Sequence, residues 1–215
     1  MKGKFVTLEG CEGVGKSTQI RLLREKLDAL GVDYVATREP GGSSIAEQIR
    51  KIILDADNEE MSDVCEALLY GAARAQHLAE VVLPALEAGK LVLCDRFIDS
   101  TFAYQGYAKG LGVELVDALN RISIGTCVPD LTVFLDLEPE AAFARKGGAD
   151  PGDRLERLGG EFHRRVYEGY RLIAAREPER FVSLRPTGSK YETAEALFDL
   201  LVRRGVIDPK GGRKA

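Results

Sequence analysis

The sequence predicts an α/β fold of three layers, in which helices cover both faces of a five-stranded parallel sheet that carries a short lid insertion. Two observations lead to this class. Short apolar runs typical of buried strands alternate along the chain with helical patterns, and a glycine-rich motif joins the first run to the first helix. The 215 residues suffice for one large core, so we expect a single domain over 1–215.

The glycine-rich motif follows the first predicted strand, 5–8, and fits G-x-x-x-x-G-K-[ST], the phosphate-binding P-loop. Apolar residues at helical spacing follow it as far as Leu30. A P-loop needs both flanks, because its N–H groups must converge on phosphate at the positive end of a helix dipole. We expect Lys16 to reach the β- and γ-phosphates and Ser17 to hold Mg²⁺. The expected nucleotide-binding residues are Gly10, Cys11, Glu12, Gly13, Val14, Gly15, Lys16, Ser17 and Thr18.

After the first helix, the run 32–36 predicts a second strand, followed by a turn over 37–42 and a helix over 44–54. Ser44 and Glu47 have the spacing of a capping box at the start of that helix. Its apolar residues recur at helical spacing, and they predict a stripe on one face. These residues are Ile45, Ile49 and Ile52.

A longer helical pattern covers 62–88, and Pro84 should bend its last turn. Its expected buried stripe comprises Val64, Leu68, Gly71, Ala75, Leu78 and Val82. The apolar run 90–94 then predicts a buried strand that ends at Asp95 and Arg96. Ligands of parallel sheets bind at this carboxyl edge, so both side chains become candidates for a site.

The remaining pattern continues the alternation of strands and helices. Its elements are helices over 100–108 and 113–124, a strand over 131–137, a helix over 139–146, a loop over 147–153, a helix through Phe162 and Ile173, a strand over 180–184, and a last helix before Gly205. We expect a lid at about 145–157 and a polar tail at about 208–215.

Composition and charge narrow the class of protein. The net charge of −4 disfavours a nucleic-acid polymer as partner, although a local basic site for a small anion fits. The four cysteines form no C-x-x-C pair and, with two histidines, no zinc pattern, so they are expected to be reduced thiols. Neither a signal segment nor an 18-residue apolar span is present, which predicts a cytoplasmic protein without a membrane partner.

A P-loop alone leaves GTPase switches, motor ATPases and small-molecule kinases open. The sequence lacks an N-K-x-D motif for guanine, and its D-x-x-G at 208–211 lies in the tail and not after a strand. Three arginines are expected near the sheet edge, namely Arg38, Arg74 and Arg96, and together they favour a second phosphorylated ligand. A solvated surface position is the usual alternative for any single arginine.

Several motifs together resemble the thymidylate kinases, a family of P-loop nucleoside monophosphate kinases, over nearly the whole length. The matching residues are Glu9-Gly10 with Glu12, Thr37-Arg38-Glu39-Pro40-Gly41-Gly42, Tyr70 with Ala72-Ala73-Arg74, Asp95-Arg96-Phe97, and Ser100-Thr101 with Ala103-Tyr104-Gln105-Gly106. Tyr70 departs from the phenylalanine expected there. It keeps an aromatic face and adds a hydroxyl that needs a partner.

The resemblance implies transfer of phosphate from ATP to dTMP with Mg²⁺, in a cytoplasmic homodimer that feeds dTTP synthesis. It implies that Arg38 and Arg96 clamp the dTMP phosphate, Glu12 faces the deoxyribose and Asp95 holds Mg²⁺ through water. Implied for the thymidine pocket are Tyr70, Arg74, Ser100, Tyr104 and Gln105, and for Glu39-Pro40 a cis peptide. The alternatives are another nucleotide or deoxynucleoside kinase of this fold and a P-loop protein that senses nucleotide without turnover.

The transition state needs a cation on the transferred phosphoryl group, and an arginine there is worth about 10³–10⁵ in rate. The four variable P-loop positions carry no cation, so we expect it from the lid. Arg145 precedes the loop 147–153, while Arg154 and Arg157 follow it. We predict Arg154 as the catalytic arginine, together with Lys16, Arg96 and Asp95, and Arg145 near the adenine. An ordinary solvated helix start is the alternative for Arg154.

Overall fold

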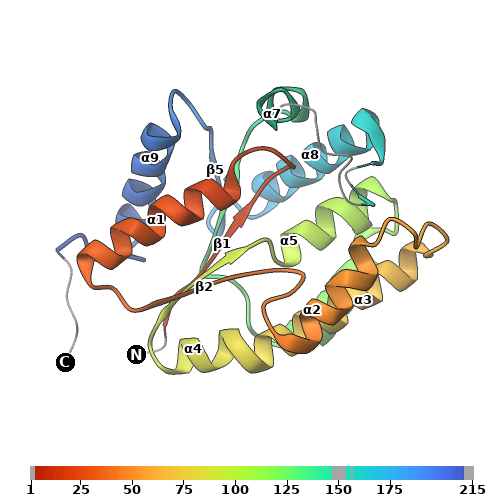
Figure 1. Ribbon diagram of the computed structural model, residues 1–215, viewed down its shortest axis with the longest axis horizontal. Coiled ribbons are helices and arrows are strands. Elements are labelled where there is room, and N and C mark those ends of the chain that lie inside the picture. The colour runs from red at the N-terminus through yellow and green to blue at the C-terminus, as the bar shows by residue number, and fades with distance from the viewer. Residues whose placement is uncertain (1–2, 147–153, 156, 211–215) are drawn as a thin grey trace.

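The computed structural model describes residues 3–146, 154–155 and 157–210. Its centre is one parallel sheet (Figure 1). The strands of this sheet follow the order β2-β3-β1-β4-β5. The strands are β1 (Phe5–Glu9), β2 (Tyr34–Arg38), β3 (Leu91–Asp95), β4 (Leu131–Leu135) and β5 (Phe181–Leu184). The predicted α/β fold with a five-stranded parallel sheet is therefore confirmed.

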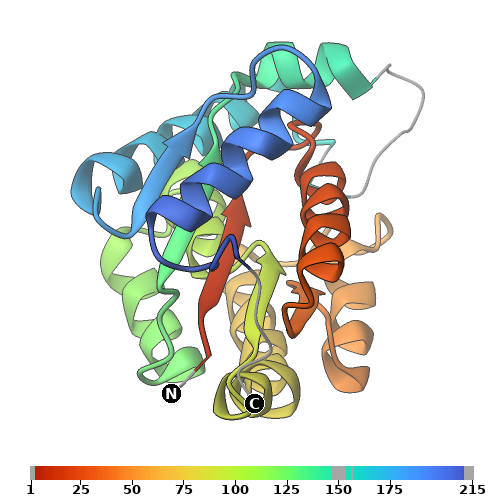
Figure 2. The ribbon, with the colours of Figure 1, turned by 90° about the vertical axis from the view of Figure 1, so that its left-hand side faces the viewer.

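Helices cover both faces of the sheet. On one face, α1 (Lys16–Leu30) and α9 (Lys190–Arg203) lie side by side (Figure 2) and pack on Leu8, Leu93 and Val133. The other face is covered by α3 (Asp63–His77), α5 (Ile98–Thr101), α6 (Val113–Ile124) and α8 (Gly159–Arg176). Both faces of the central strands are thus buried, which explains why their sequences are apolar throughout rather than alternating.

The pattern predicted as one helix over 62–88 is interrupted. It divides into α3, the π-helical turn η1 (Leu78–Val82) and α4 (Leu83–Glu87). The interruption lies before Pro84 because a proline lacks the N–H that its preceding turn would bond, and its ring crowds that turn. The pattern over 100–108 likewise divides into α5 and a π-helical turn, η2 (Phe102–Ala108).

The predicted buried stripe is wrong along the whole of α3. Val64, Leu68 and Ala75 are exposed and Gly71 is half-buried, whereas Glu66, Ala67 and Arg74 are buried. The stripe is right only at Leu78 and Val82, in η1. The buried face of this helix is polar because its charged side chains find partners inside the molecule, and hydrophobic periodicity therefore selects the outer face. The same reversal occurs on α2 (Ser44–Leu54), where the stripe residues Ile45 and Ile52 are exposed and Ala46 and Ile53 are buried.

The capping box predicted at Ser44 is also wrong. Ser43 is the N-cap of α2, and its side chain makes no capping bond. Glu47 instead accepts a hydrogen bond from the N–H of Gly42 at 2.8 Å and pairs with Arg38. A tertiary partner has thus replaced the local one.

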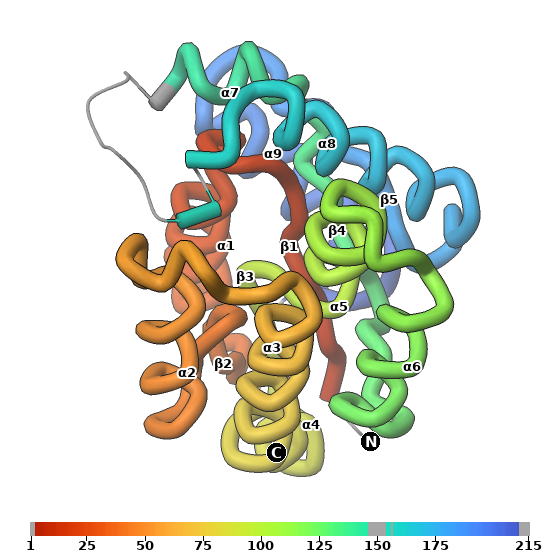
Figure 3. The backbone as a smooth tube through the Cα atoms, turned by 90° about the vertical axis from the view of Figure 1, so that its right-hand side faces the viewer, coloured from red at the N-terminus to blue at the C-terminus, as the bar shows by residue number. Residues whose placement is uncertain are grey.

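The remaining helix, α7 (Pro139–Lys146), lies beside α8 (Figure 3). The predicted loop 147–153 and the end of the predicted tail, 211–215, lie outside the described residues. Within the part of the chain that is described, no helix has the length and apolar character needed to cross a bilayer.

Candidate active site

A pocket of about 550 Å³ opens at the carboxyl edge of the sheet, beside the P-loop. Elements from distant parts of the sequence meet there: the loop between β1 and α1, the ends of β2 and β3, α3 and η2. Most predicted site residues border it. They are Glu12, Gly13, Gly15, Lys16, Ser17, Thr18, Arg38, Tyr70, Arg74, Asp95, Arg96, Ser100, Tyr104 and Gln105.

The P-loop joins β1 to α1 as its motif predicts. Gly13 has a φ of 77°, and a Cβ there would lie 2.6 Å from the carbonyl oxygen of Ala142, so only glycine fits. The Lys16 ammonium lies inside the loop and donates to the carbonyl oxygens of Gly10 and Cys11, each at 3.0 Å. Burial, with the nearby Arg96, lowers the pKa of Lys16 from its ordinary value.

Ser17 and Asp95 meet where a divalent cation would be needed. The Ser17 hydroxyl donates to Oδ2 of Asp95 at 3.3 Å. The other carboxylate oxygen, Oδ1, is buried and has no hydrogen-bond partner among the described residues. A buried carboxylate oxygen without a partner is costly, and oxygen ligands of this kind suit Mg²⁺. The pair therefore fits a magnesium site.

Arg96 crosses the floor of the pocket. Its backbone has a φ of 70°, uncommon for a residue with a side chain, and its guanidinium donates to the hydroxyls of Ser100 at 3.3 Å and Tyr170 at 3.0 Å. It also pairs with Glu12 and lies over the ring of Tyr104. These contacts fix the guanidinium plane before any ligand arrives, which suits bidentate recognition of phosphate.

Glu9 supports this arrangement from beneath. It is fully buried at the end of β1 and accepts hydrogen bonds from the N–H of Phe97 at 2.7 Å and the hydroxyls of Ser100 at 2.7 Å and Tyr170 at 2.9 Å. Burial, reinforced by the negative charge of Asp99, raises its pKa to about 7. Glu9 thus orients two of the hydroxyls that hold Arg96.

Arg74 is 2% exposed, and its guanidinium is already bound. Nε donates to Glu39 at 2.7 Å, Nη1 to the Asn120 carbonyl oxygen at 3.0 Å, and Nη2 to the Thr101 hydroxyl at 2.9 Å. The other Glu39 oxygen lies 2.9 Å from Nδ1 of His77. The Glu39-Pro40 peptide that follows is cis, as the family resemblance implies.

Two arginines border the pocket from the β2 side. Arg38 is half-exposed, and Nη2 donates to both carboxylate oxygens of Glu47, at 3.0 and 2.9 Å. Arg50 on α2 donates to the carbonyl oxygen of Pro40 at 2.8 Å and also lines the pocket. Arg38 is thus where the sequence predicts it, held by a surface carboxylate that an anionic ligand can replace.

Arg154 does not line the pocket, contrary to the prediction that it faces the transferred phosphoryl group. It is buried, pairs with Glu66, and donates from Nε to the carbonyl oxygen of Ile53 at 3.1 Å. The Arg154 guanidinium therefore binds the buried Glu66 carboxylate, although its place in the sequence predicted a position in the lid. Arg145 is exposed on α7 and also lies outside the pocket.

Three P-loop residues are likewise absent from the pocket lining: Gly10, Cys11 and Val14. The side chains of Cys11 and Val14 are buried in the core beside β4. Sequence analysis assigned no role to Glu9, Glu39, Arg50 or Tyr170, although each contacts or borders the site. For Glu9 the available signal was a charged residue directly after a predicted strand, and for Glu39 it was a charged residue in the turn that follows the next predicted strand.

Comparisons with known proteins agree on one family. The family model described as thymidylate kinase matches residues 8–197. The thymidylate kinase of Oceanobacillus iheyensis is 52% identical over 188 residues, covering 86% of this chain and 83% of that protein. The thymidylate kinase of Pelobacter propionicus is 47% identical over 203 residues, covering 91% and 92%. The crystal structure of thymidylate kinase from Ehrlichia chaffeensis matches with a TM-score of 0.77 at 30% identity, covering 94% of this chain and all of that one.

The raised pKa of Glu9 predicts a pH-dependent stability. The pKa of Glu9 is about 7 in the folded protein, against an ordinary value of 4.5, so the folded protein holds this proton more tightly than the unfolded chain does. The stability that results is fully present below pH 4.5 and is lost as pH rises through 7. Glu9→Gln keeps an acceptor and a donor without the charge. We expect its free energy of unfolding, relative to the parent chain, to rise between pH 5 and pH 8 by up to about 3 kcal/mol, measured by urea unfolding.

Glu47→Gln serves as the control of opposite sign. Partial burial opposes ionisation there, but the Gly42 N–H and Arg38 hold the pKa of Glu47 below its ordinary value. Its substitution should therefore cost stability at neutral pH, and the cost should shrink as pH falls. A Glu9→Gln difference that stays constant with pH would refute the role assigned to burial.

Proposed function

We propose, for a chain that belongs to the thymidylate kinase family and phosphorylates dTMP to dTDP with ATP, that the pocket holds the two nucleotides in separate halves. The P-loop half takes the phosphates of ATP. The half between β2, α3 and η2 takes dTMP. What carries this assignment is the fixed guanidinium of Arg96, which lies between the halves beside the P-loop.

In the ATP half, the N–H groups of the P-loop and the start of α1 favour phosphate. The Lys16 ammonium is already desolvated and held by two carbonyl oxygens. Phosphate oxygens can replace those carbonyls, so binding exchanges partners instead of stripping water from a new charge. Lys16 then neutralises charge on the β- and γ-phosphates.

In the dTMP half, Arg96 and Arg38 would clamp the monophosphate. Arg96 supplies a preset fork of donors, and Arg38 can leave Glu47 because that pair is largely exposed and weak. This pair of cations supports a monophosphate over the alternative of an unphosphorylated deoxynucleoside, which has no anion for them. The acceptor oxygen of dTMP would thereby face the P-loop.

The sugar and base would lie deeper, against aromatic and amide side chains. Glu12 would face the deoxyribose, with Ser100 and Tyr104 beside it. The rings of Tyr70 and Tyr104 offer stacking faces for the base. Gln105 offers an amide to the edge of the base. Arg74 borders this region with a guanidinium already bound to Glu39, Asn120 and Thr101. We assign to Arg74 the role of fixing the pocket wall.

We assign Mg²⁺ to Ser17 and to the unpartnered Oδ1 of Asp95, through water. When bound, the ion would supply positive charge that neutralises phosphate oxygens. Lys16 and Arg96 supply the protein's own positive charge to the transferred group. Arg154 is left out of this mechanism, because withdrawing it from the fully buried Glu66 would cost on the order of 3–5 kcal/mol.

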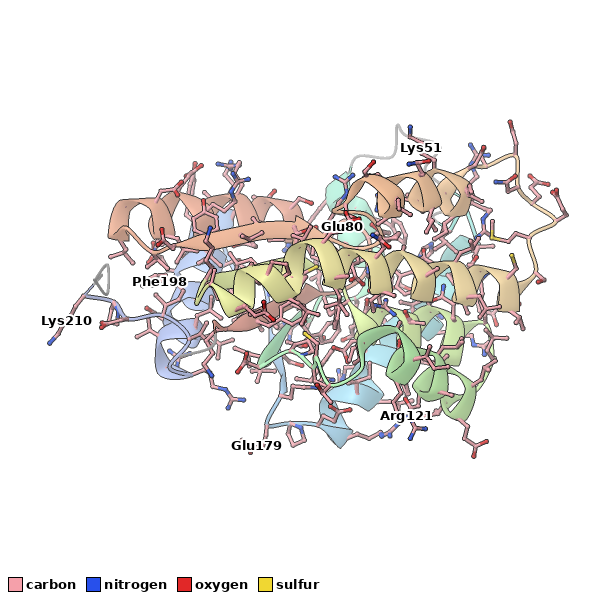
Figure 4. The ribbon with its side chains drawn as sticks, turned by 90° about the horizontal axis from the view of Figure 1, so that it is seen from below. Lys51, Glu80, Arg121, Glu179, Phe198 and Lys210 are labelled. Carbon is pink, nitrogen blue, oxygen red and sulfur yellow. The ribbon has the colours of Figure 1, made fainter. Side chains whose placement is uncertain are left out.

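We further propose that the chain forms a homodimer through α2, α3 and α6. Figure 4 shows these helices side by side on one face of the molecule, with Lys51 and Arg121 projecting from α2 and α6. Large apolar side chains are exposed along them: Ile45, Ile52, Val64, Leu68, Val113, Leu115 and Ile122. A face of this kind suits a second copy, because a twofold axis places each apolar helix against its equivalent.

Lys16→Ala should lower turnover by roughly a thousandfold or more, because the charge on the β- and γ-phosphates loses its partner. A coupled assay of ADP release measures this, with thermal unfolding to show that the fold is intact. Lys26→Ala, on the exposed side of the same helix, is the matched control and should keep its activity. Turnover within tenfold of the parent would exclude the assigned P-loop role.

Arg96→Ala should weaken dTMP binding by roughly thirtyfold, the equivalent of one charge-assisted contact of about 2 kcal/mol, and leave ATP binding nearly unchanged. Titration calorimetry with each nucleotide separates the two effects. Arg176→Ala, on α8 and outside the pocket, is the control. Equal losses for both nucleotides would show that Arg96 does not belong to the dTMP half.

Leu68→Glu should halve the mass in solution, from twice the 23.5 kDa of one chain to a single copy, because it places a charge within the apolar face. Light scattering after size exclusion measures the mass. Leu172→Glu, on α8 away from this face, should leave the mass unchanged. A parent chain that is already monomeric at micromolar concentration would refute the dimer.

A further inference from the structure

Glu66 is a carboxylate for which phosphoryl transfer has no direct use. It lies on α3, is 0% exposed and does not border the pocket. Oε1 accepts a hydrogen bond from Nε2 of Gln105 at 2.7 Å, while Oε2 pairs with Lys109 at 2.8 Å and with Arg154. One buried side chain thus joins α3 to η2 and to the residue that follows 147–153.

The contact with Glu66 determines which end of the Gln105 amide enters the pocket. A carboxylate accepts hydrogen bonds and donates none, so only the NH₂ group of Gln105 can face it. Gln105 is 1% exposed yet borders the pocket, and no residue in the described ranges bonds its side-chain oxygen. The polar atom that this side chain presents to a ligand is therefore an acceptor.

Lys109 and Arg154 make this orientation durable. Both bind Oε2, which leaves Oε1 for the amide, and Lys109 is itself held by Asp63 at 2.8 Å. Rotation of the Gln105 amide would bring its oxygen against Oε1 inside the protein, where two acceptors without a proton between them repel. The Gln105 amide and Glu66 thus keep their hydrogen bond only when the amide oxygen faces the pocket.

We propose that Glu66 is a positioning residue that makes the pocket select a pyrimidine with a ring N–H. Thymine and uracil carry a hydrogen on N3, and the Gln105 oxygen that faces the pocket can accept a hydrogen bond from it. Cytosine carries a lone pair there, which the same oxygen repels. The inference rests on the proposed placement of the base against Gln105, and it assigns the discrimination to a side chain that never touches the nucleotide.

Glu66→Gln tests the proposal. An amide at 66 can donate as well as accept, so Gln105 can turn and offer Nε2 to N3 of cytosine. Steady-state kinetics with dTMP, dUMP and dCMP should show the dTMP-to-dCMP ratio of kcat/KM falling by about tenfold, with the dCMP value itself rising. The dTMP-to-dUMP ratio should stay constant, because both bases carry the N3 hydrogen.

The control is Lys109→Met, which removes a partner of Glu66 but keeps the contact with Gln105, and it should leave the dTMP-to-dCMP ratio within twofold. If Glu66→Gln alone does not fold, the double variant Glu66→Gln/Lys109→Met, which keeps the net charge of the cluster, should show the same drop. A loss shared equally by dTMP and dCMP in the folded variant would overturn the proposal and leave Glu66 a structural residue.

Gln105→Leu separates this failure from failure of the proposed base site. If the base lies against Gln105, KM for dTMP should rise severalfold in this variant, and a drop in the ratio for Glu66→Gln then supports the proposal. If KM for dTMP is unchanged in Gln105→Leu, the base lies elsewhere. The placement of dTMP then falls, and the role of Glu66 falls with it.

Discussion

The buried ion pair of Glu39 and Arg74 is the interaction on which the half of the pocket between β2, α3 and η2 depends. Through Arg74, α3 is joined to the end of β2, to α5 at Thr101 and to α6 at Asn120. Through Glu39, the pair also holds His77 and the turn that follows Arg38, the last residue of β2. Removing one member would strand the other in the interior at a cost on the order of 3–5 kcal/mol. Loss of this ion pair would therefore disturb several walls of the pocket at once.

The site has two layers of charge with different tasks. The inner layer, Glu9, Glu39 and Glu66, is buried and fixes the direction of hydroxyls, guanidinium groups and an amide. The outer layer, Lys16, Arg38 and Arg96, lines the pocket. Positioning accounts for much of the rate in phosphoryl transfer, because the protein does little covalent chemistry there. The inner carboxylates are thus part of the catalytic design although none is a catalytic residue.

Sequence analysis could predict the outer layer and not the inner one. The P-loop and Asp95-Arg96 are local motifs attached to recognisable strands, so their neighbours in sequence reveal their place in space. A buried glutamate has the same local pattern as a solvated one, and its partners lie far away: Glu9 meets Tyr170, and Glu66 meets Arg154. On α2 and α3, apolar periodicity selects the wrong face for a related reason, because it cannot distinguish a face that packs on the core from an exposed one.

Helix α3 carries Tyr70 and Arg74 toward the pocket and Val64 and Leu68 toward the outside. Each residue added to a helix turns everything beyond it by about 100°. One residue inserted between Leu68 and Tyr70 would therefore rotate Val64 and Leu68 by this angle relative to Tyr70 and Arg74. The two sets could then no longer face the outside and the pocket together, whatever amino acid was added. Substitutions can vary either face separately, but the number of residues between them is fixed. In this stretch of the chain we expect divergence by replacement and not by a change of length.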